Sequence, residues 1–123
     1  MSDLYEKSGP WRGRWTQLKL RAAGTMRLHL TFEGPDIRGG GSDSSGPFTM
    51  DGSFDADTNE VAITKSYSFL TVLYRGRWDG VMIAGTSSIV GNQFFDTGEF
   101  EMWPESGELS IGEMMREEAV ASL

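Results

Sequence analysis

Lys65 is the residue whose position most invites a chemical interpretation. Alternation along residues 61–67 places it on the same side of a strand as Val61 and Ile63, where an apolar residue is expected. A buried ammonium is costly unless it is paired and hydrogen-bonded, normally with a carboxylate. If no bulge interrupts the glycines, the same counting along residues 37–43 brings Asp43 to the inner face, so Asp43 is the first candidate partner. The alternative partners are Asp51 and Glu99.

Two interpretations of Lys65 remain open from the sequence. In one, the lysine lies near a strand end and extends its ammonium to water at the rim of the fold, with Tyr67 packing beside it. In the other, Lys65, Asp43, Tyr67 and Tyr74 form a polar set inside an apolar pocket and orient a ligand. A desolvated lysine in such a pocket also has the chemistry of a base or a Schiff-base amine.

Other familiar chemistries find little support in the residue types. The chain has no cysteine and one histidine, which excludes thiolate metal sites and argues against zinc. The glycine-rich segment 39–46 lacks the lysine and the helix of a phosphate-binding loop, so a flexible loop is expected there. Residues 55–59 lack the following glycine and glutamate of a calcium loop and are expected to form a hairpin turn. We therefore expect no metal and no cofactor.

The composition suits one folded domain. A chain of 123 residues can bury about two-thirds of its surface. The net charge of -7 leaves no basic surplus for a phosphate backbone, so no nucleic-acid partner is expected. No apolar run is long enough to span a membrane, and the N-terminal segment does not resemble a secretory signal. A cytoplasmic location without a membrane partner is the resulting expectation.

Period-two alternation interrupted by turn residues predicts an all-β fold. The clearest strand covers residues 25–33, in which Met26, Leu28 and Leu30 share one face. The other strands are expected at 11–20, from about 37 into 39–41, 46–55, 60–67, 69–78, 81–87 and 92–103, with Asp79-Gly80 as a two-residue hairpin turn. Short turns imply antiparallel neighbours, and closure of the sheet removes its unpaired edges. The sequence thus predicts a single antiparallel up-and-down eight-stranded β-barrel, with a two-sheet sandwich as the alternative.

The alternation stops beyond Pro104. Ser110 and Glu113 then fit a capping box, which predicts a short helix over residues 111–121. The expected organisation is an N-terminal extension at 1–10, a β-barrel domain at 11–104 and a C-terminal tail with a short helix at 105–123.

The tripeptide Gly13-Arg14-Trp15 on the first strand, followed by seven further strands, resembles the Gly-x-Trp opening of the calycin superfamily. That superfamily includes lipocalins, fatty-acid-binding proteins and avidins. The resemblance covers residues 11–103 as architecture and the tripeptide as motif. It implies a barrel with an interior cavity, in which members of these families bind small apolar molecules or biotin. The chain lacks the cysteines of secreted lipocalins and the helical lid of fatty-acid-binding proteins, so the resemblance names no subfamily and no ligand.

Three functions fit these features. The first is a binding module that holds a small, largely apolar ligand in the barrel with Lys65, Asp43 and a set of aromatic side chains. That set comprises Trp15, Phe32, Phe48, Phe54, Tyr67, Tyr74, Phe100 and Trp103. The second is a barrel filled by its own side chains that forms a homo-oligomer through an outer apolar patch. That patch would comprise Leu18, Leu20, Leu73, Met82 and Ala84. The third, less favoured than a non-enzymatic role, is an enzyme using Lys65 and Asp43 as an acid–base pair.

Overall fold

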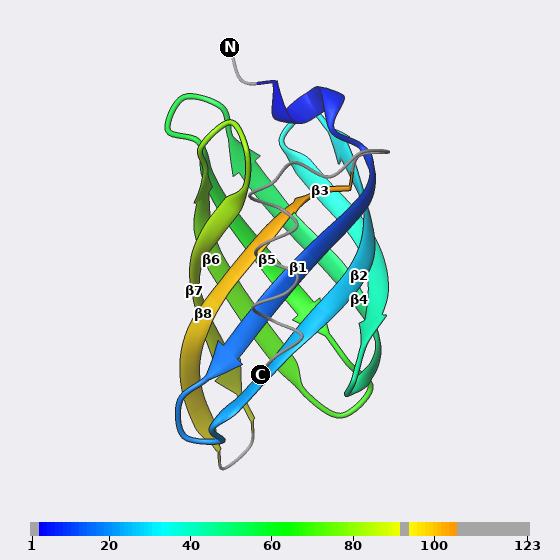
Figure 1. Ribbon diagram of the computed structural model, residues 1–123. Helices are drawn as coiled ribbons and strands as arrows, with labels where there is room; N and C mark the ends of the chain where they lie inside the picture. The colour runs from blue at the N-terminus through cyan, green and yellow to red at the C-terminus, as the bar shows by residue number, and fades with distance from the viewer. Residues whose placement is uncertain (1–2, 92–93, 106–123) are drawn as a thin grey trace.

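The computed structural model is a single closed barrel (Figure 1). It describes residues 3–91 and 94–105. A short 3-10 helix precedes eight strands, and the elements are η1 (Leu4–Glu6), β1 (Gly9–Gln17), β2 (Ala22–Glu33), β3 (Asp36–Asp43), β4 (Gly46–Asp55), β5 (Glu60–Ser66), β6 (Thr71–Trp78), β7 (Ile83–Val90) and β8 (Phe95–Pro104). Neighbouring strands are antiparallel throughout, and β1 pairs with β8 to close the ring. The predicted all-β, up-and-down eight-stranded barrel is confirmed, and the sandwich alternative is wrong.

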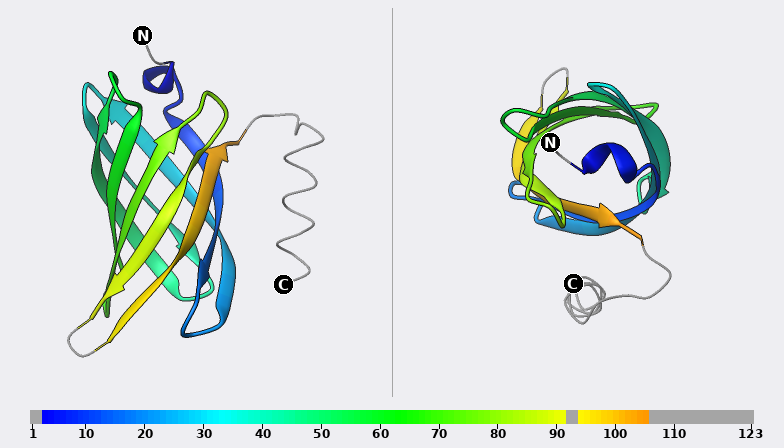
Figure 2. Two further views of the ribbon diagram at one scale, coloured as in Figure 1. Left: turned by 90° about the vertical axis from the view of Figure 1, so that its left-hand side faces the viewer. Right: turned by 90° about the horizontal axis from the view of Figure 1, so that it is seen from above.

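Because successive strands reverse direction, the connections gather at two ends of the barrel (Figures 1 and 2). The Leu4 end carries η1 and the connections β2–β3, β4–β5 and β6–β7. The Tyr67 end carries the connections β1–β2, β3–β4, β5–β6 and β7–β8. No helix within residues 3–91 and 94–105 is both long enough and apolar enough to cross a membrane.

The Leu4 end is filled by the chain itself. In the end-on view η1 lies within the ring of strands (Figure 2), and Leu4 is 0% exposed. Two indole hydrogen bonds hold this segment in place. Trp11 Nε1 donates to the Lys7 carbonyl at 2.8 Å, and Trp78 Nε1 donates to the Asp3 carboxylate at 3.0 Å. The described part of the N-terminal segment is therefore a plug for the barrel. The N-terminal extension was expected to cover residues 1–10, but β1 already begins at Gly9.

The strand expected from about residue 37 into 39–41 continues to Asp43, so most of the glycine-rich segment is strand and the flexible loop expected over 39–46 is reduced to a turn. Gly39, Gly40 and Gly41 pair continuously with β2 on one side and β4 on the other, and only residues 44–45 remain as a turn. The glycines reflect close approach of the backbone. A Cβ at Gly39 would lie 2.0 Å from the His29 carbonyl oxygen, and one at Gly41 would lie 2.0 Å from that of Arg27. Side chains there would push neighbouring strands apart, so this part of the barrel requires glycine.

The connection after β6 also differs from the prediction. It spans four residues, 79–82, where a two-residue hairpin turn was expected. The Asp79 carboxylate accepts the backbone N–H groups of Val81 and Met82, each at 2.8 Å, and this Asx turn lengthens the loop. Residues 55–59 form the expected Asx-rich hairpin turn, in which Asp55 accepts the N–H of Asp57 at 2.9 Å. The helix predicted at 111–121 lies outside the described residues.

The outer apolar patch expected from the sequence is not present as a unit. Met82 is buried at 9% exposure, and Ala84 is only partly exposed. Leu18 and Leu20 are exposed, but they lie in the β1–β2 turn at the Tyr67 end, whereas Leu73 lies within β6. The predicted grouping is therefore wrong, because it treated the turn residues and Met82 as parts of regular strands.

Candidate functional site

A buried ion pair occupies the interior near the Tyr67 end. Lys65 comes from the end of β5 and Asp43 from the end of β3, and both point inward. The Lys65 Nζ atom lies 2.8 Å from Asp43 Oδ2, and the two side chains are 1% and 0% exposed. The predicted partnership is thus present, while the alternative in which Lys65 reaches water at the rim is wrong. Asp51 and Glu99, the alternative partners, are exposed.

Further hydrogen bonds complete the network around this pair. Lys65 Nζ also donates to the Tyr74 hydroxyl at 3.3 Å and contacts the Met26 sulfur at 3.6 Å. Asp43 Oδ2 accepts the hydroxyl of Tyr67, and Oδ1 accepts the backbone N–H of Ser45 at 2.8 Å. A buried charge pair needs such additional bonds to offset its desolvation. The four polar residues predicted to act together therefore form one connected cluster.

Aromatic rings surround the ammonium of Lys65. Its Nζ atom lies 4.3 Å from the ring centroid of Phe48, 4.9 Å from that of Tyr67, 5.7 Å from that of Tyr74 and 5.8 Å from that of Trp15. Ring faces attract a cation through their quadrupole, and desolvation strengthens that attraction. These contacts are a second reason why the ammonium is tolerated inside the barrel.

Burial changes the acid–base behaviour of the cluster. It lowers the pKa of Lys65 below its ordinary value, although the hydrogen bond and the charge of Asp43 act in the opposite direction. Burial also raises the pKa of Tyr67, and the hydrogen bond to Asp43 raises it further. The pKa of Tyr74 is raised as well, first by burial and then by the negative charge of Asp43. Both tyrosines therefore remain neutral well above the pH at which a free tyrosine ionises.

A cavity of about 130 Å³ adjoins this cluster. Its wall is contributed by strands and connections at the Tyr67 end and comprises Trp15, Gln17, Leu20, Ala22, Ser45, Lys65, Tyr67, Leu70, Val72, Tyr74 and Ile89. Two larger hollows, of about 380 and 510 Å³, lie on the outer wall of the barrel. Of these three, the cavity at the Tyr67 end is the better candidate site because Lys65, Tyr67 and Tyr74 of the buried polar cluster line it.

Two residues on the cavity wall each have a buried polar atom that lacks a hydrogen-bond partner within the described residues. Gln17 is 5% exposed; its Nε2 donates to Ser87 Oγ at 3.1 Å, but its Oε1 accepts nothing. The indole Nε1 of Trp15 is also buried without an acceptor. Buried polar groups in native proteins are nearly always paired, so each exception calls for an explanation. Here one acceptor and one donor belong to residues that line the same cavity.

Several predicted ring residues lie away from this cavity. Phe54 packs against Tyr5 of the η1 plug, with ring centroids 5.6 Å apart, and Phe32 packs against Trp11. Both belong to the filled Leu4 end. Phe100 stacks behind Tyr74, with ring centroids 4.3 Å apart, and does not line the cavity. Trp103 follows the inward-facing Met102 and occupies the opposite face of β8.

Gln17 is a candidate site residue that the sequence reasoning missed. The available signal was the alternation along β1, where Trp11, Gly13 and Trp15 already defined the inner face. Continuing that count by one step places Gln17 inside the barrel.

Comparisons of the chain with models of known protein families, with curated proteins and with solved structures found no match. The fold and the geometry of the interior cluster therefore carry the functional argument.

Proposed function

We propose that the barrel binds a small, neutral, largely apolar molecule in the cavity at the Tyr67 end. The observation that carries this proposal is that two residues lining one cavity, Gln17 and Trp15, each have a buried polar atom without a hydrogen-bond partner among the described residues. A ligand that donates one hydrogen bond and accepts another carries the partner types that these two atoms lack. The resemblance of Gly13-Arg14-Trp15 to the calycin opening supports the same type of function.

The charges around the cavity favour a neutral ligand. Lys65 and Asp43 are the charged residues of the cluster, and they neutralise each other at 2.8 Å. The hydrogen bonds of Lys65 go to Asp43 and Tyr74, so its ammonium is already occupied. A ligand carrying its own charge would enter a mostly apolar space without a free counter-charge among the described lining residues, which is costly.

The size of the cavity limits the ligand to about one ring. A cavity of about 130 Å³ is close to the roughly 150 Å³ space that holds benzene in an engineered protein. Val72, Leu70 and Ile89 supply apolar wall. A single ring with one amide or hydroxyl group matches both the volume and the polar atoms.

Binding can be tested with four single-ring probes observed through the backbone amide signals in NMR titrations. Benzamide and phenol carry neutral hydrogen-bonding groups, benzoate has a similar shape with a charge, and toluene has no hydrogen-bonding group. We expect benzamide and phenol to shift amides around the cavity and to bind more tightly than toluene. Pairing one buried polar atom is worth about 1–3 kcal/mol, so the expected preference is about five- to 150-fold. Benzoate should bind more weakly than benzamide.

A matched pair of variants shows whether Gln17 is responsible. Gln17→Leu removes the acceptor at similar size and should reduce the preference for benzamide over toluene. Thr49→Ala on the outer face of β4 is the control and should leave all four affinities unchanged. If no probe shifts the cavity amides, or if benzamide and toluene bind equally to the wild-type protein, the proposal is wrong.

A further inference from the structure

Exposed apolar side chains concentrate at the Tyr67 end. Eight large hydrophobic residues in the described part of the chain are exposed. Six of these lie in or next to the β1–β2, β5–β6 and β7–β8 connections at this end. The six are Leu18, Leu20, Phe69, Val90, Phe94 and Phe95, with exposures from 43% to 71%. Of the other two, Leu73 lies within β6 and Val81 lies at the Leu4 end. Apolar tips on several loops around one end of a barrel are an unusual feature for a freely solvated surface.

The charges are segregated along the same axis. At the Tyr67 end the structure describes residues 17–22, 43–46, 66–71, 90–91 and 94–95 of the connections, and their exposed charged residues are Lys19 and Arg21. The carboxylate of Asp43 is 0% exposed and turned inward. Lys19 Nζ donates to the Phe95 carbonyl at 2.9 Å and lies 5.8 Å from the centroid of the Phe95 ring. The ammonium of Lys19 is therefore adjacent to one of the exposed apolar side chains.

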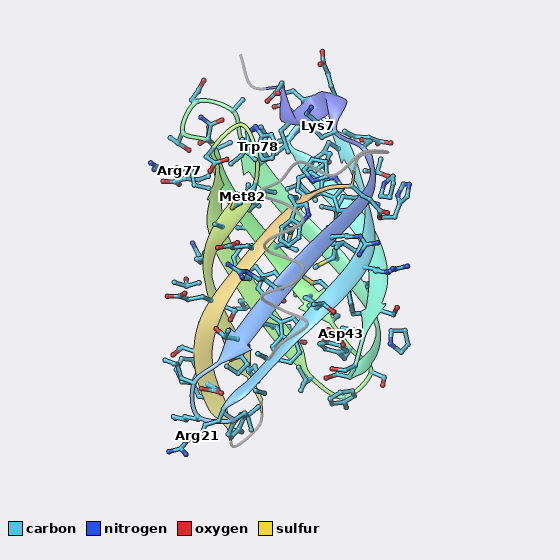
Figure 3. The ribbon with its side chains drawn as sticks, viewed as in Figure 1. Lys7, Arg21, Asp43, Arg77, Trp78 and Met82 are labelled. Atoms are coloured by element: carbon cyan, nitrogen blue, oxygen red, sulfur yellow. The ribbon has the colours of Figure 1, made fainter. Side chains whose placement is uncertain are left out.

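The opposite end carries the negative charge. The described connections at the Leu4 end, residues 3–8, 33–36, 55–60, 78–83 and 104–105, hold one basic residue, Lys7. Their exposed acidic residues are Asp3, Glu6, Glu33, Asp36, Asp55, Asp57, Glu60, Asp79 and Glu105. Figure 3 shows Arg21 and Lys7 at the two opposite ends of the barrel.

We propose that the Tyr67 end docks on an anionic lipid surface, with the apolar tips entering the interface and Lys19 and Arg21 against the headgroups. Apolar side chains flanked by basic residues are what holds a peripheral protein on such a surface. The sequence led us to expect no membrane partner because no segment spans a bilayer, and docking of loop tips needs no such segment. This contact is independent of whether the cavity binds a ligand.

A lipid surface fits these residues better than a second copy of the chain. Pairing two copies through the Tyr67 end would bring Lys19 and Arg21 of both copies together without exposed carboxylates in the described connections to neutralise them. Pairing the Tyr67 end with the Leu4 end would satisfy the charges, but the large hydrophobic residue exposed there is Val81 alone among those described. The six apolar tips would then have little apolar surface to contact.

The net charge of -7 does not prevent this orientation. A strand of about ten residues, rising roughly 3.3 Å per residue and tilted by about 40°, separates the two ends by roughly 25 Å. The Debye length is about 8 Å at physiological ionic strength. The acidic Leu4 end is therefore screened from the lipid when the Tyr67 end faces it.

Vesicle sedimentation tests the proposal with the full chain. We expect binding to vesicles of equimolar phosphatidylcholine and phosphatidylserine, and weaker binding to pure phosphatidylcholine. The variant Leu18→Ser/Phe94→Ser should lower the partition coefficient about tenfold or more, because both side chains are exposed tips. Val81→Ser is the matched control at the Leu4 end and should change it little.

A charge pair of variants tests the electrostatic part. Arg21→Glu should lower the partition coefficient on the anionic vesicles about fivefold or more. Arg77 lies in β6 next to the Leu4 end, and Arg77→Glu should change the coefficient less than about twofold. Equal binding to both vesicle types, or an unchanged coefficient for Leu18→Ser/Phe94→Ser, overturns the proposal. Sedimentation velocity without lipid covers the remaining outcome: a dimer that Leu18→Ser/Phe94→Ser dissociates would assign this surface to a second copy and overturn the lipid assignment.

Discussion

At Lys65, burial disfavours the charged form of the ammonium, whereas the ion pair with Asp43 favours it. The side chain is 1% exposed, and its stability inside the barrel depends on the Asp43 carboxylate at 2.8 Å. Lys65→Met keeps the length of the side chain but leaves the carboxylate without its cation. We expect a loss of about 3–5 kcal/mol in the free energy of unfolding, measured by urea denaturation.

The double variant Lys65→Met/Asp43→Leu is the informative comparison. It removes both charges, so it should recover at least half of the loss seen in Lys65→Met. A single variant as stable as the wild type would show that the pair is not energetically coupled in the folded state.

The two raised tyrosine pKa values predict how stability responds to alkaline pH. Tyr67 and Tyr74 stay protonated in the folded barrel, whereas in the unfolded chain they ionise near pH 10. Their contribution is complete below about pH 10 and is lost as pH rises above it, because only the unfolded state releases the protons. The lowered pKa of Lys65 opposes this trend only up to the ordinary lysine value of 10.5.

The test is the slope of the free energy of unfolding against pH above the ordinary lysine pKa of 10.5. Tyr67→Phe should make the decline shallower by up to about 1.4 kcal/mol per pH unit, since it removes one titrating group. An unchanged slope in Tyr67→Phe would contradict the assignment of the alkaline response to this residue.

Alternation predicted part of the ion pair at this scale, because it left open whether Lys65 pairs inside the barrel or extends to water at the rim. It placed Lys65 and Asp43 on the inner face before any distance was known, because side-chain period and strand direction are properties of the local sequence. That Gln17 Oε1 and Trp15 Nε1 have no partner among the described residues was not predictable in the same way. Whether a buried polar atom finds a partner depends on the rotamers and positions of residues from several strands.

At the scale of elements, β3 shows where composition misleads. A run of glycines suggests a loop, yet here glycine allows β2 and β3 to approach closely. Gly41→Ala should cost about 1–3 kcal/mol in the free energy of unfolding, because its Cβ would lie 2.0 Å from the Arg27 carbonyl oxygen. Gly40→Ala is the control, since its nearest atom is 3.0 Å away, and thermal unfolding should show the smaller loss. Equal losses would mean that general glycine entropy, and not close approach, governs β3.

The strands themselves were more predictable than the connections between them. The expected strand at 46–55 coincides with β4, because an alternating segment buries the same face wherever it pairs. The loop at 79–82 differed from its prediction, because the Asp79 carboxylate competes for backbone N–H groups that a tight turn would leave to the strands.

For the whole molecule, the sequence left open whether the barrel is filled or hollow, and the two ends give different answers. Leu4 and the η1 segment fill one end, while a cavity of about 130 Å³ lies at the other. Alternation distinguishes inside from outside but carries no information on how completely side chains fill the interior. That property depends on the summed volumes of residues from all eight strands.

This division predicts that the two ends contribute independently to stability. Leu4→Ala should destabilise the protein by about 2–5 kcal/mol through a cavity at the Leu4 end. Tyr67→Phe should cost about 1.5–3 kcal/mol by removing a hydrogen bond to the Asp43 carboxylate. The residues lie at opposite ends of a packed barrel, so the loss in the double variant should equal the sum within about 0.5 kcal/mol. Urea denaturation of the four proteins measures this coupling energy. A coupling above about 1 kcal/mol would show that the plug and the polar cluster act as one unit, since only shared partners or a transmitted backbone shift produce such coupling.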